Sequence, residues 1–190
     1  MSERWNANWP GGPPVAHELK STFHDRWVRF HSLYDSKRHP ENEAEYQTLL
    51  HRHDLTMREM FPEADVYVIT TVFTGSADEP RTLQDPTPLK LNPEARRWAV
   101  LTEDLPGGDD FRVYAHLYAA RRRLNAGAFD LLLRAVADEK PIDVLVADVE
   151  FRRVYHPYDG GADCLLESPE ARDKLKAAHP HWLSPHSHGL

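Results

Sequence analysis

Hydrophobic positions recur at spacings of three and four along residues 42–61, which is the pattern of an amphipathic helix with one buried stripe. Asn42 stands at its start and Glu45 follows three residues later, which makes an approximate capping box. Pro62 ends the pattern because proline cannot continue a helix. This stretch is the clearest helix that the sequence predicts.

Two shorter segments have the same helical spacing. Residues 126–139 lie between Asn125, a residue type that can cap a helix, and Pro141, which ends the pattern. Ser168, followed by a proline and an acidic residue, predicts a last helix. Together with the long helix, these segments predict about three helices.

Alternation and β-branched residues predict the strands. Residues 66–73 are apolar on both faces, which is typical of a strand in the middle of a sheet. A weaker alternation at residues 27–31 fits a short edge strand or the end of a helix, and we favour the strand. Further strands are expected at residues 97–102, 111–119, 143–151, 154–158 and 162–166, several of them joined as hairpins by Gly- and Pro-containing turns. The predicted fold class is α+β, an antiparallel or mixed β-sheet with its helices mostly on one face.

The pattern of hydrophobic and polar positions divides the chain into three parts. Residues 1–20 show no periodicity and predict an extended N-terminal arm, residues 21–184 predict a single α+β domain, and residues 185–190 predict a flexible, His-containing tail. Within the domain, residues 75–96 contain four prolines and little periodicity. A loop of this length exceeds the roughly 12–15 residues usual in compact domains, so we expect a flexible flap, a lid or an insertion there.

Composition narrows the class of protein. The chain of 190 residues is 41% hydrophobic and 28% charged, which is ordinary for a folded domain. Its one cysteine, Cys164, argues against a disulfide scaffold and favours a cytoplasmic location. The N-terminus lacks the basic segment followed by an apolar stretch that marks a signal peptide, so none is expected. The longest uncharged run, 66–77, is shorter than the ~18 residues that a membrane span needs.

The charge balance bears on partners. The formal net charge is −7, which argues against binding of nucleic acid and suits a basic protein partner. Two local basic patches, 121–123 and 152–153, are expected to pair with acidic side chains. The function that the sequence favours first is therefore protein binding by an immunity-type or regulatory module. The sequence predicts neither an oligomeric state nor a reaction.

Motifs for a cofactor or a metal are weak. The sequence contains no P-loop, no GxGxxG and no GxSxG, so no cofactor is predicted. His51 and His53 lie on different sides of the predicted helix, and four histidines between residues 179 and 188 are expected to form a solvated tail, so no metal site is predicted. Cys164 could face His156 across a hairpin as a nucleophile, although a small buried cysteine is commonly only a hydrophobe.

Several stretches resemble a known family. They are Val28-Arg29-Phe30 before the long helix, the strand at 66–73, and the ending 151–163 with the sequence FRRVYHPYDGGAD. Together they resemble an uncharacterised bacterial family, domain of unknown function 3885, over roughly residues 22–185. The signature of that family is an aromatic-Asp pair, a turn ending in Gly, and an Asp two residues later, which correspond here to Tyr158, Asp159, Gly161 and Asp163, with Trp182 beyond them. The family often has a further acid and an Arg in the turn, where this chain has only Gly160. The resemblance implies a fold and no mechanism.

An alternative function is a hydrolase or small-ligand-binding protein with its pocket under the 75–96 loop. Paired acids point to it, because Asp148 and Glu150 are expected on one face of a strand with an aspartate of the hairpin opposite. The candidate ligand-binding residues are Arg29, Asp148, Tyr158, Asp159 and Asp163.

Overall fold

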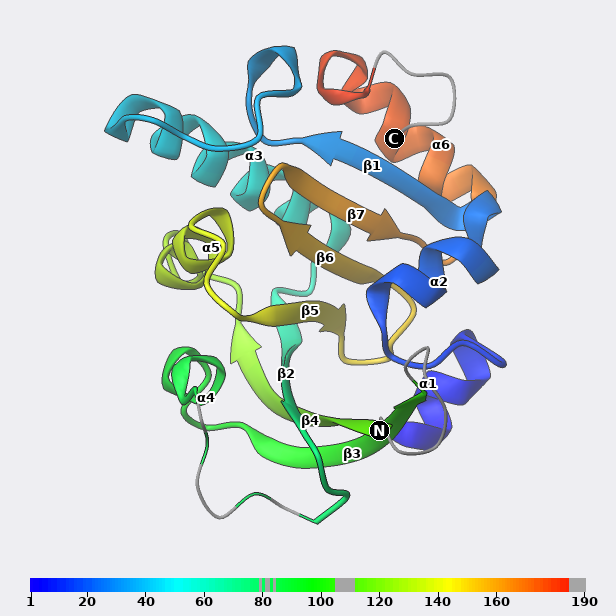
Figure 1. Cartoon of the computed structure of the whole chain (residues 1–190). Helices are drawn as coiled ribbons and strands as arrows, with labels where there is room; N and C mark the ends of the chain where they lie inside the picture. The colour runs from blue at the N-terminus through cyan, green and yellow to red at the C-terminus, as the bar shows by residue number, and fades with distance from the viewer. Residues whose placement is uncertain (79, 81–82, 84, 105–111, 185–190) are drawn as a thin grey trace.

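A seven-stranded sheet runs through the molecule, and every pair of neighbouring strands in it is antiparallel (Figure 1). The computed structural model describes residues 1–78, 80, 83, 85–104 and 112–184. The strands are β1 (Trp27–His31), β2 (Asp65–Thr74), β3 (Arg96–Asp104), β4 (Arg112–Arg123), β5 (Asp143–Asp148), β6 (Val154–Tyr158) and β7 (Gly161–Leu165). Their order across the sheet is β1-β7-β6-β5-β2-β4-β3. The prediction of an α+β fold with an antiparallel sheet is confirmed.

Helices cover both faces of this sheet. They are α1 (Ser2–Asn8), α2 (Ala16–Thr22), α3 (Glu43–Met60), α4 (Thr87–Leu91), α5 (Asp130–Ala137) and α6 (Pro169–Ala178), with single 3-10 turns η1 (His24–Arg26), η2 (Tyr34–Ser36) and η4 (Pro180–Trp182). The described residues therefore hold more helices than the predicted three. The extra helices are one or two turns long, which is too short for hydrophobic periodicity to appear in the sequence.

One face of the sheet packs against α3, α5 and α6. A core of buried side chains from these helices meets the inward residues of the strands, such as Val68, Val146 and Cys164. Local signals fix the helix ends as predicted for two of them. The side chain of Asn42 accepts a hydrogen bond from the backbone N–H of Glu45 at the start of α3, and Ser168 caps α6 in the same way.

The opposite face packs against α1 and α2, which corrects the prediction of an extended arm over residues 1–20. Trp5 and Trp9 are buried, and their indole N–H groups donate to the backbone oxygens of Gly12 and Phe151 at 2.8 Å and 2.7 Å. The i,i+4 spacing of the two tryptophans places both on one side of a short helix. Two positions are too few to show as a period, so the sequence analysis missed the helix.

Most strand predictions are confirmed. β2 lies between β4 and β5, inside the sheet as its two apolar faces predict, and β1 is an edge strand. In β4 the face predicted to be polar is also covered, because His116 and Tyr118 are buried. α5 begins later than predicted and its N-cap is Phe129, so Asn125 does not cap it.

Other predictions concern the loops and the tail. The predicted 75–96 loop contains α4, so it is partly helical. The connection between β3 and β4 and the predicted tail at 185–190 lie outside the described residues. Within the described part of the chain, every helix is too short or too polar to cross a membrane.

Candidate functional site

Three neighbouring strands place polar side chains together on the face that α1 and α2 cover. Arg29 of β1 is paired in register with Asp163 of β7, and Asp163 is paired in turn with His156 of β6. Alternate residues of a strand share a face, so His31 and Tyr158 lie on this face as well. In Figure 1, α2 lies beside the end of β7 on this face of the sheet.

Asp163 is the centre of this group. Its side chain is 3% exposed, and Arg29 holds it through two bonds, from Nε to Oδ1 at 2.7 Å and from Nη2 to Oδ2 at 2.9 Å. The indole N–H of Trp27 donates to Oδ1 at 2.8 Å. Burial opposes ionisation of this carboxyl group, but nearby His156 and Arg29 outweigh it and hold the pKa of Asp163 well below its ordinary value. Asp163 is therefore a buried carboxylate with every close partner a donor.

His156 lies between two carboxylates. Its Nε2 is 3.2 Å from Oδ1 of Asp143, and its Nδ1 is 3.9 Å from Oδ2 of Asp163. Burial alone would lower the pKa of His156, but the two carboxylates outweigh burial and raise it to about 9. The ring is thus a cation at neutral pH. Its Nδ1 is buried and has no hydrogen-bond partner among the described residues.

The polar row continues beyond His156. Oδ2 of Asp143, on β5, accepts a hydrogen bond from the hydroxyl of Thr71, on β2, at 3.0 Å. The row therefore crosses five adjacent strands, β1, β7, β6, β5 and β2, on one face of the sheet. Other positions of that face, such as Leu145 and Leu165, belong to the apolar core under α1 and α2. A polar row on an otherwise apolar face concentrates perturbed pKa values in one place, which is common at functional sites.

A cleft of about 500 Å³ opens beside this row. Arg29 lines it with its guanidinium 4.8 Å from the ring centroid of Tyr158, and Arg38 forms an ion pair with Asp159 at its rim. His31 also lines the cleft, and its Nε2 is buried without a hydrogen-bond partner among the described residues. Burial, followed by the positive charge of Arg29, lowers the pKa of His31, so this ring is neutral near pH 7. The cleft thus combines one cationic and one neutral imidazole.

β1 and β7, which carry Arg29 and Asp163 of the cleft, pack closely at Gly161. A Cβ atom at Gly161 would overlap the backbone oxygen of Phe30, so only glycine allows the two strands to approach this closely. The hairpin turn at Asp159 and Gly160 then brings Tyr158 opposite Gly161. Glycine at this position is needed for the strand packing.

The structure brings together four of the five predicted ligand-binding residues. Arg29, Tyr158, Asp159 and Asp163 all line the cleft. Asp148 does not, and this corrects its predicted place beside Asp163. It is the last residue of β5, an odd number of positions after Asp143, so its side chain belongs to the opposite face of the sheet.

Asp148 has a structural role instead. Its Oδ1 accepts a hydrogen bond from the backbone N–H of Arg153 at 2.8 Å, and its Oδ2 lies 3.4 Å from Nε of Arg152. These contacts close the turn between β5 and β6. Glu150, predicted on the same strand face, lies in that turn and pairs with Arg4 at 3.4 Å.

The hypothesis of a cysteine nucleophile is wrong. Cys164 pairs in register with Tyr155, so it lies on the opposite face from His156. It is fully buried in the core under α3, and burial raises the pKa of its thiol well above the ordinary value. A buried neutral thiol of this kind is chemically inert.

The basic patch at the end of β4 is paired with acidic and backbone groups, as expected. Arg121 donates to Asp65 at 2.8 Å, and Arg123 lies 3.9 Å from the same carboxylate. Arg122 donates to the backbone oxygens of Leu91 and Ala128 at 3.3 Å each.

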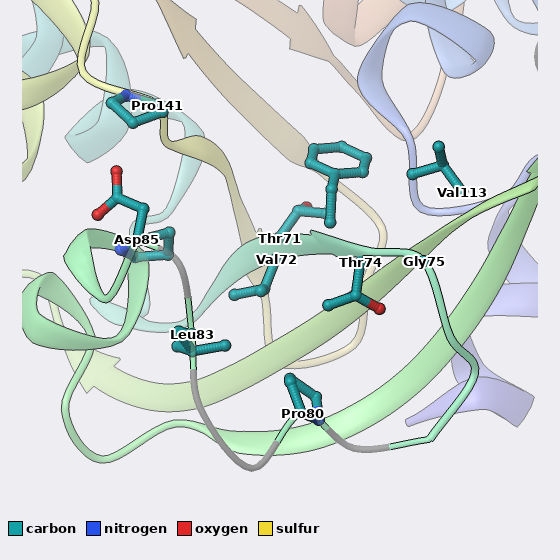
Figure 2. A pocket seen from close by; sticks show the side chains of 11 residues that line it. Thr71, Val72, Thr74, Gly75, Pro80, Leu83, Asp85, Val113 and Pro141 are labelled. Atoms are coloured by element: carbon teal, nitrogen blue, oxygen red, sulfur yellow. The ribbon is translucent and has the colours of Figure 1, made fainter.

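A second cavity, of about 550 Å³, lies under the 75–96 segment (Figure 2). Figure 2 shows Pro80 and Leu83 of that segment on the same side of the cavity, with Val72 and Thr74 of β2 opposite them. Asp85 is the one ionisable residue among its described lining. The predicted pocket under this segment exists, but none of the predicted ligand-binding residues lines it.

One group of side chains has the chemistry of metal ligands. One ligand atom each from His39, Glu139 and Asp159 lies within 4.8 Å of the others. Arg38 already pairs with Asp159. The hydrogen bond and the negative charge of Asp159, and then the charge of Glu139, raise the pKa of the Arg38 guanidinium. A divalent cation would have to displace this guanidinium, so we assign no metal to the group.

Sequence reasoning did not select His156, Asp143 or His31 as ligand-binding residues. A two-residue turn at Asp159 and Gly160 fixes the register of β6 and β7, and this register alone places His156 beside Asp163. Asp143 lies two strands away from β7, and no local sequence signal predicts that order of strands.

The fold and this cleft define an antiparallel α+β protein with a polar row leading into a cationic cleft. The family described as domain of unknown function (DUF3885) matches residues 15–187, and the chain belongs to that family. The resemblance seen in the sequence is thereby confirmed. No curated protein and no solved structure matches the chain.

Proposed function

We propose that the protein binds a small anionic molecule, one that carries a carboxylate or phosphate group, in the cleft beside His156. The observation that carries this proposal concerns two histidines that line the same cleft. Nδ1 of His156 and Nε2 of His31 are both buried, and neither has a hydrogen-bond partner among the described residues. Buried polar atoms are normally hydrogen-bonded. An anionic oxygen would accept from Nδ1 of His156, and a hydroxyl group of the ligand, such as that of a hydrogen phosphate, would donate to Nε2 of His31, whose ring already donates to the backbone oxygen of Gly160.

The charge of the cleft favours an anion. His156 is protonated below about pH 9, so its Nδ1 carries a proton and donates. Arg29 uses Nε and Nη2 for Asp163, which leaves Nη1 outside that pair. Lys20 and Arg38 add two cations, while Asp159 and Asp163 are the carboxylates that line the cleft. Four cations and two carboxylates leave the lining positive in a chain whose formal net charge is −7.

The size of the cleft suits a small metabolite. Its volume of about 500 Å³ lies within the range of roughly 300–1,000 Å³ that small-molecule sites occupy. The site is also preorganised, because Asp163 holds Arg29 in place and is itself held by the indole N–H of Trp27. This is the small-ligand alternative of the sequence analysis, moved from the pocket under the 75–96 segment to the cleft on the other half of the sheet.

Isothermal titration with inorganic phosphate and with succinate tests the proposal. We expect both probes to bind the full chain, and Lys20→Gln to weaken them by roughly tenfold, the loss of one charged hydrogen bond. Lys176→Gln is the matched control, because Lys176 is an exposed lysine of α6 that does not line the cleft. His31→Phe keeps a ring but removes the unpartnered acceptor nitrogen, so it should weaken phosphate, which can donate a proton, more than succinate.

Two outcomes would overturn the proposal. One is the absence of heat with either probe at millimolar concentration in the folded protein. The other is an equal loss of affinity in Lys20→Gln and Lys176→Gln, because it would reduce the effect to net charge. Affinity should also fall above about pH 9, where His156 loses its proton.

Binding of a basic protein partner, as an immunity-type or regulatory module of a bacterial cytoplasm, stays a prediction from the net charge of −7. A complex of that kind should weaken steeply with added salt. Failure to capture any protein at low salt would contradict it.

A further inference from the structure

Arg52 of α3 is a buried cation without an acidic partner. The residue is 6% exposed, and its Nη1 donates to the backbone oxygens of His31 and Leu33 at 2.9 Å and 3.1 Å. In the described part of the chain, no carboxylate lies within ion-pair distance of its guanidinium. Buried charges are normally paired with an opposite charge, because removal from water is costly. The position of Arg52 therefore calls for an explanation.

Two aromatic rings frame the guanidinium. Its carbon Cζ is 4.6 Å from the ring centroid of Tyr34 and 5.3 Å from that of Trp182. Trp182 is held by His179, whose ring stacks on it at 3.9 Å and whose Nε2 bonds Glu59 at 2.7 Å. The faces of these rings replace an acidic partner only in part, because a neutral ring attracts a cation through its quadrupole and not through a net negative charge.

A cavity of about 660 Å³ adjoins this group. Arg52, Tyr34 and Trp182 line it together with two histidines, His51 and His181, and its described lining includes no carboxylate. Its residues can supply positive charge, hydrogen-bond donors and aromatic surface. Tyr34 is 72% exposed, so a large ring surface here faces solvent.

We propose that this cavity is a second binding site, for an anionic group attached to an aromatic or heterocyclic ring. The anionic group pairs with Arg52, and the ring stacks on the exposed ring of Tyr34, beside Trp182. Carboxylates and phosphate esters share the anionic chemistry that a guanidinium recognises.

This site is separate from the cleft. α3 and Arg52 belong to the face of the sheet opposite Arg29 and His156, and none of the described residues lines both cavities. The inference therefore stands whether or not the cleft binds an anion.

Four probes separate the two parts of the ligand: benzoate and phenyl phosphate, which carry a ring, and acetate and inorganic phosphate, which do not. In titrations of the full chain we expect the ring-bearing probes to bind roughly tenfold more tightly than their counterparts. Comparison of benzoate with phenyl phosphate shows which anionic group the site prefers, and either preference supports the site.

Variants locate the binding. Arg52→Gln should weaken both ring-bearing probes by at least about tenfold. Because Arg52 also holds two backbone oxygens, this variant could lose stability, and Tyr34→Leu provides a second test at an exposed position. It should remove the preference for a ring and leave the fold intact. Phe73→Leu, at another exposed aromatic on β2, is the matched control and should change nothing.

Three results would overturn the inference. They are no binding of any ring-bearing probe by the folded protein at millimolar concentration, equal affinities with and without a ring, and unchanged affinities in Tyr34→Leu. Lys20→Gln distinguishes the two sites, because it should weaken phosphate in the cleft and leave benzoate at Arg52 unaffected. Loss of benzoate in Lys20→Gln would place that probe in the cleft and refute the second site.

Discussion

Replacement of His156 by glutamine should change how the stability of the protein depends on pH. The pKa of His156 is about 9 in the folded protein, against about 6.5 for an unperturbed histidine in an unfolded chain. A group whose pKa is raised by folding stabilises the fold fully below its unfolded pKa, and this contribution is lost as pH rises through the folded pKa. The stabilisation by His156 is therefore present below about pH 6.5 and disappears by about pH 9 to 10.

The magnitude follows from the same two values. At about 1.36 kcal/mol per pKa unit, their difference corresponds to roughly 3 kcal/mol of unfolding free energy. The side chain is 19% exposed, so screening by solvent removes only part of this. For a chain of this length, about 3 kcal/mol corresponds to a fall of roughly 6–12 °C in Tm across the window.

Urea unfolding at a series of pH values between about 6 and 10 measures the effect. The free energy of unfolding of the native chain should fall with rising pH by more than that of His156→Gln, because other groups titrate equally in both. His24→Gln, at an exposed histidine, is the matched control and should follow the native chain. Asp143→Asn should narrow the window, since it removes the closest carboxylate that raises the pKa of His156. Parallel curves for the native chain and His156→Gln across the window would refute the reasoning.

Two further predictions concern the same half of the sheet. Gly161→Ala should cost about 3 kcal/mol in thermal unfolding, because the new Cβ meets the fixed backbone of Phe30. Gly75→Ala, with nothing within 4 Å of its Cβ, should change stability by no more than about 0.5 kcal/mol, and equal effects of the two variants would contradict the close packing of β1 on β7. Joint replacement of Arg29 by Met and of Asp163 by Leu should leave stability within about 2 kcal/mol of the native chain and abolish phosphate binding, and retained binding would contradict the role of the pair.

The sequence predicted those parts of the fold that local chemistry determines. Asn42 and Ser168 cap α3 and α6 because their side chains bond backbone N–H groups a few residues away, and such signals lie within one turn of chain. The two apolar faces of residues 66–73 predicted an interior strand for the same reason, since both faces of that segment are covered. Each of these predictions needed only a short window of sequence.

The parts that failed depend on distant contacts. α1 is held by the bonds of Trp5 to Gly12 and of Trp9 to Phe151, and the second partner is far away in the chain. The sequence could not show that Asp148 lies on the face of the sheet opposite Asp163, because the end of β5 is set by the turn that Asp148 itself closes.

The candidate site divides in the same way. Tyr158, Asp159 and Asp163 were found because a hairpin turn makes them neighbours, and the edge strand beside them carries Arg29. His156 and Asp143 become a pair only when β5 is placed next to β6, which is a property of the whole sheet.

The free energy of burying charges bears on why the polar row exists. A buried ion pair is a poor source of stability, because the cost of removing two charges from water offsets most of their attraction, and apolar residues of similar size commonly serve as well or better. The face that carries Arg29, Asp163 and His156 is elsewhere built from Trp, Leu, Val and Ala side chains, so an apolar continuation of the core would fit the fold. An apolar row would serve the fold as well, whereas the charged row leaves Nδ1 of His156 without a hydrogen-bond partner among the described residues and adjoins a cleft. A ligand that completes the hydrogen bonds of the row accounts for both features, and stabilisation of the fold accounts for neither of them.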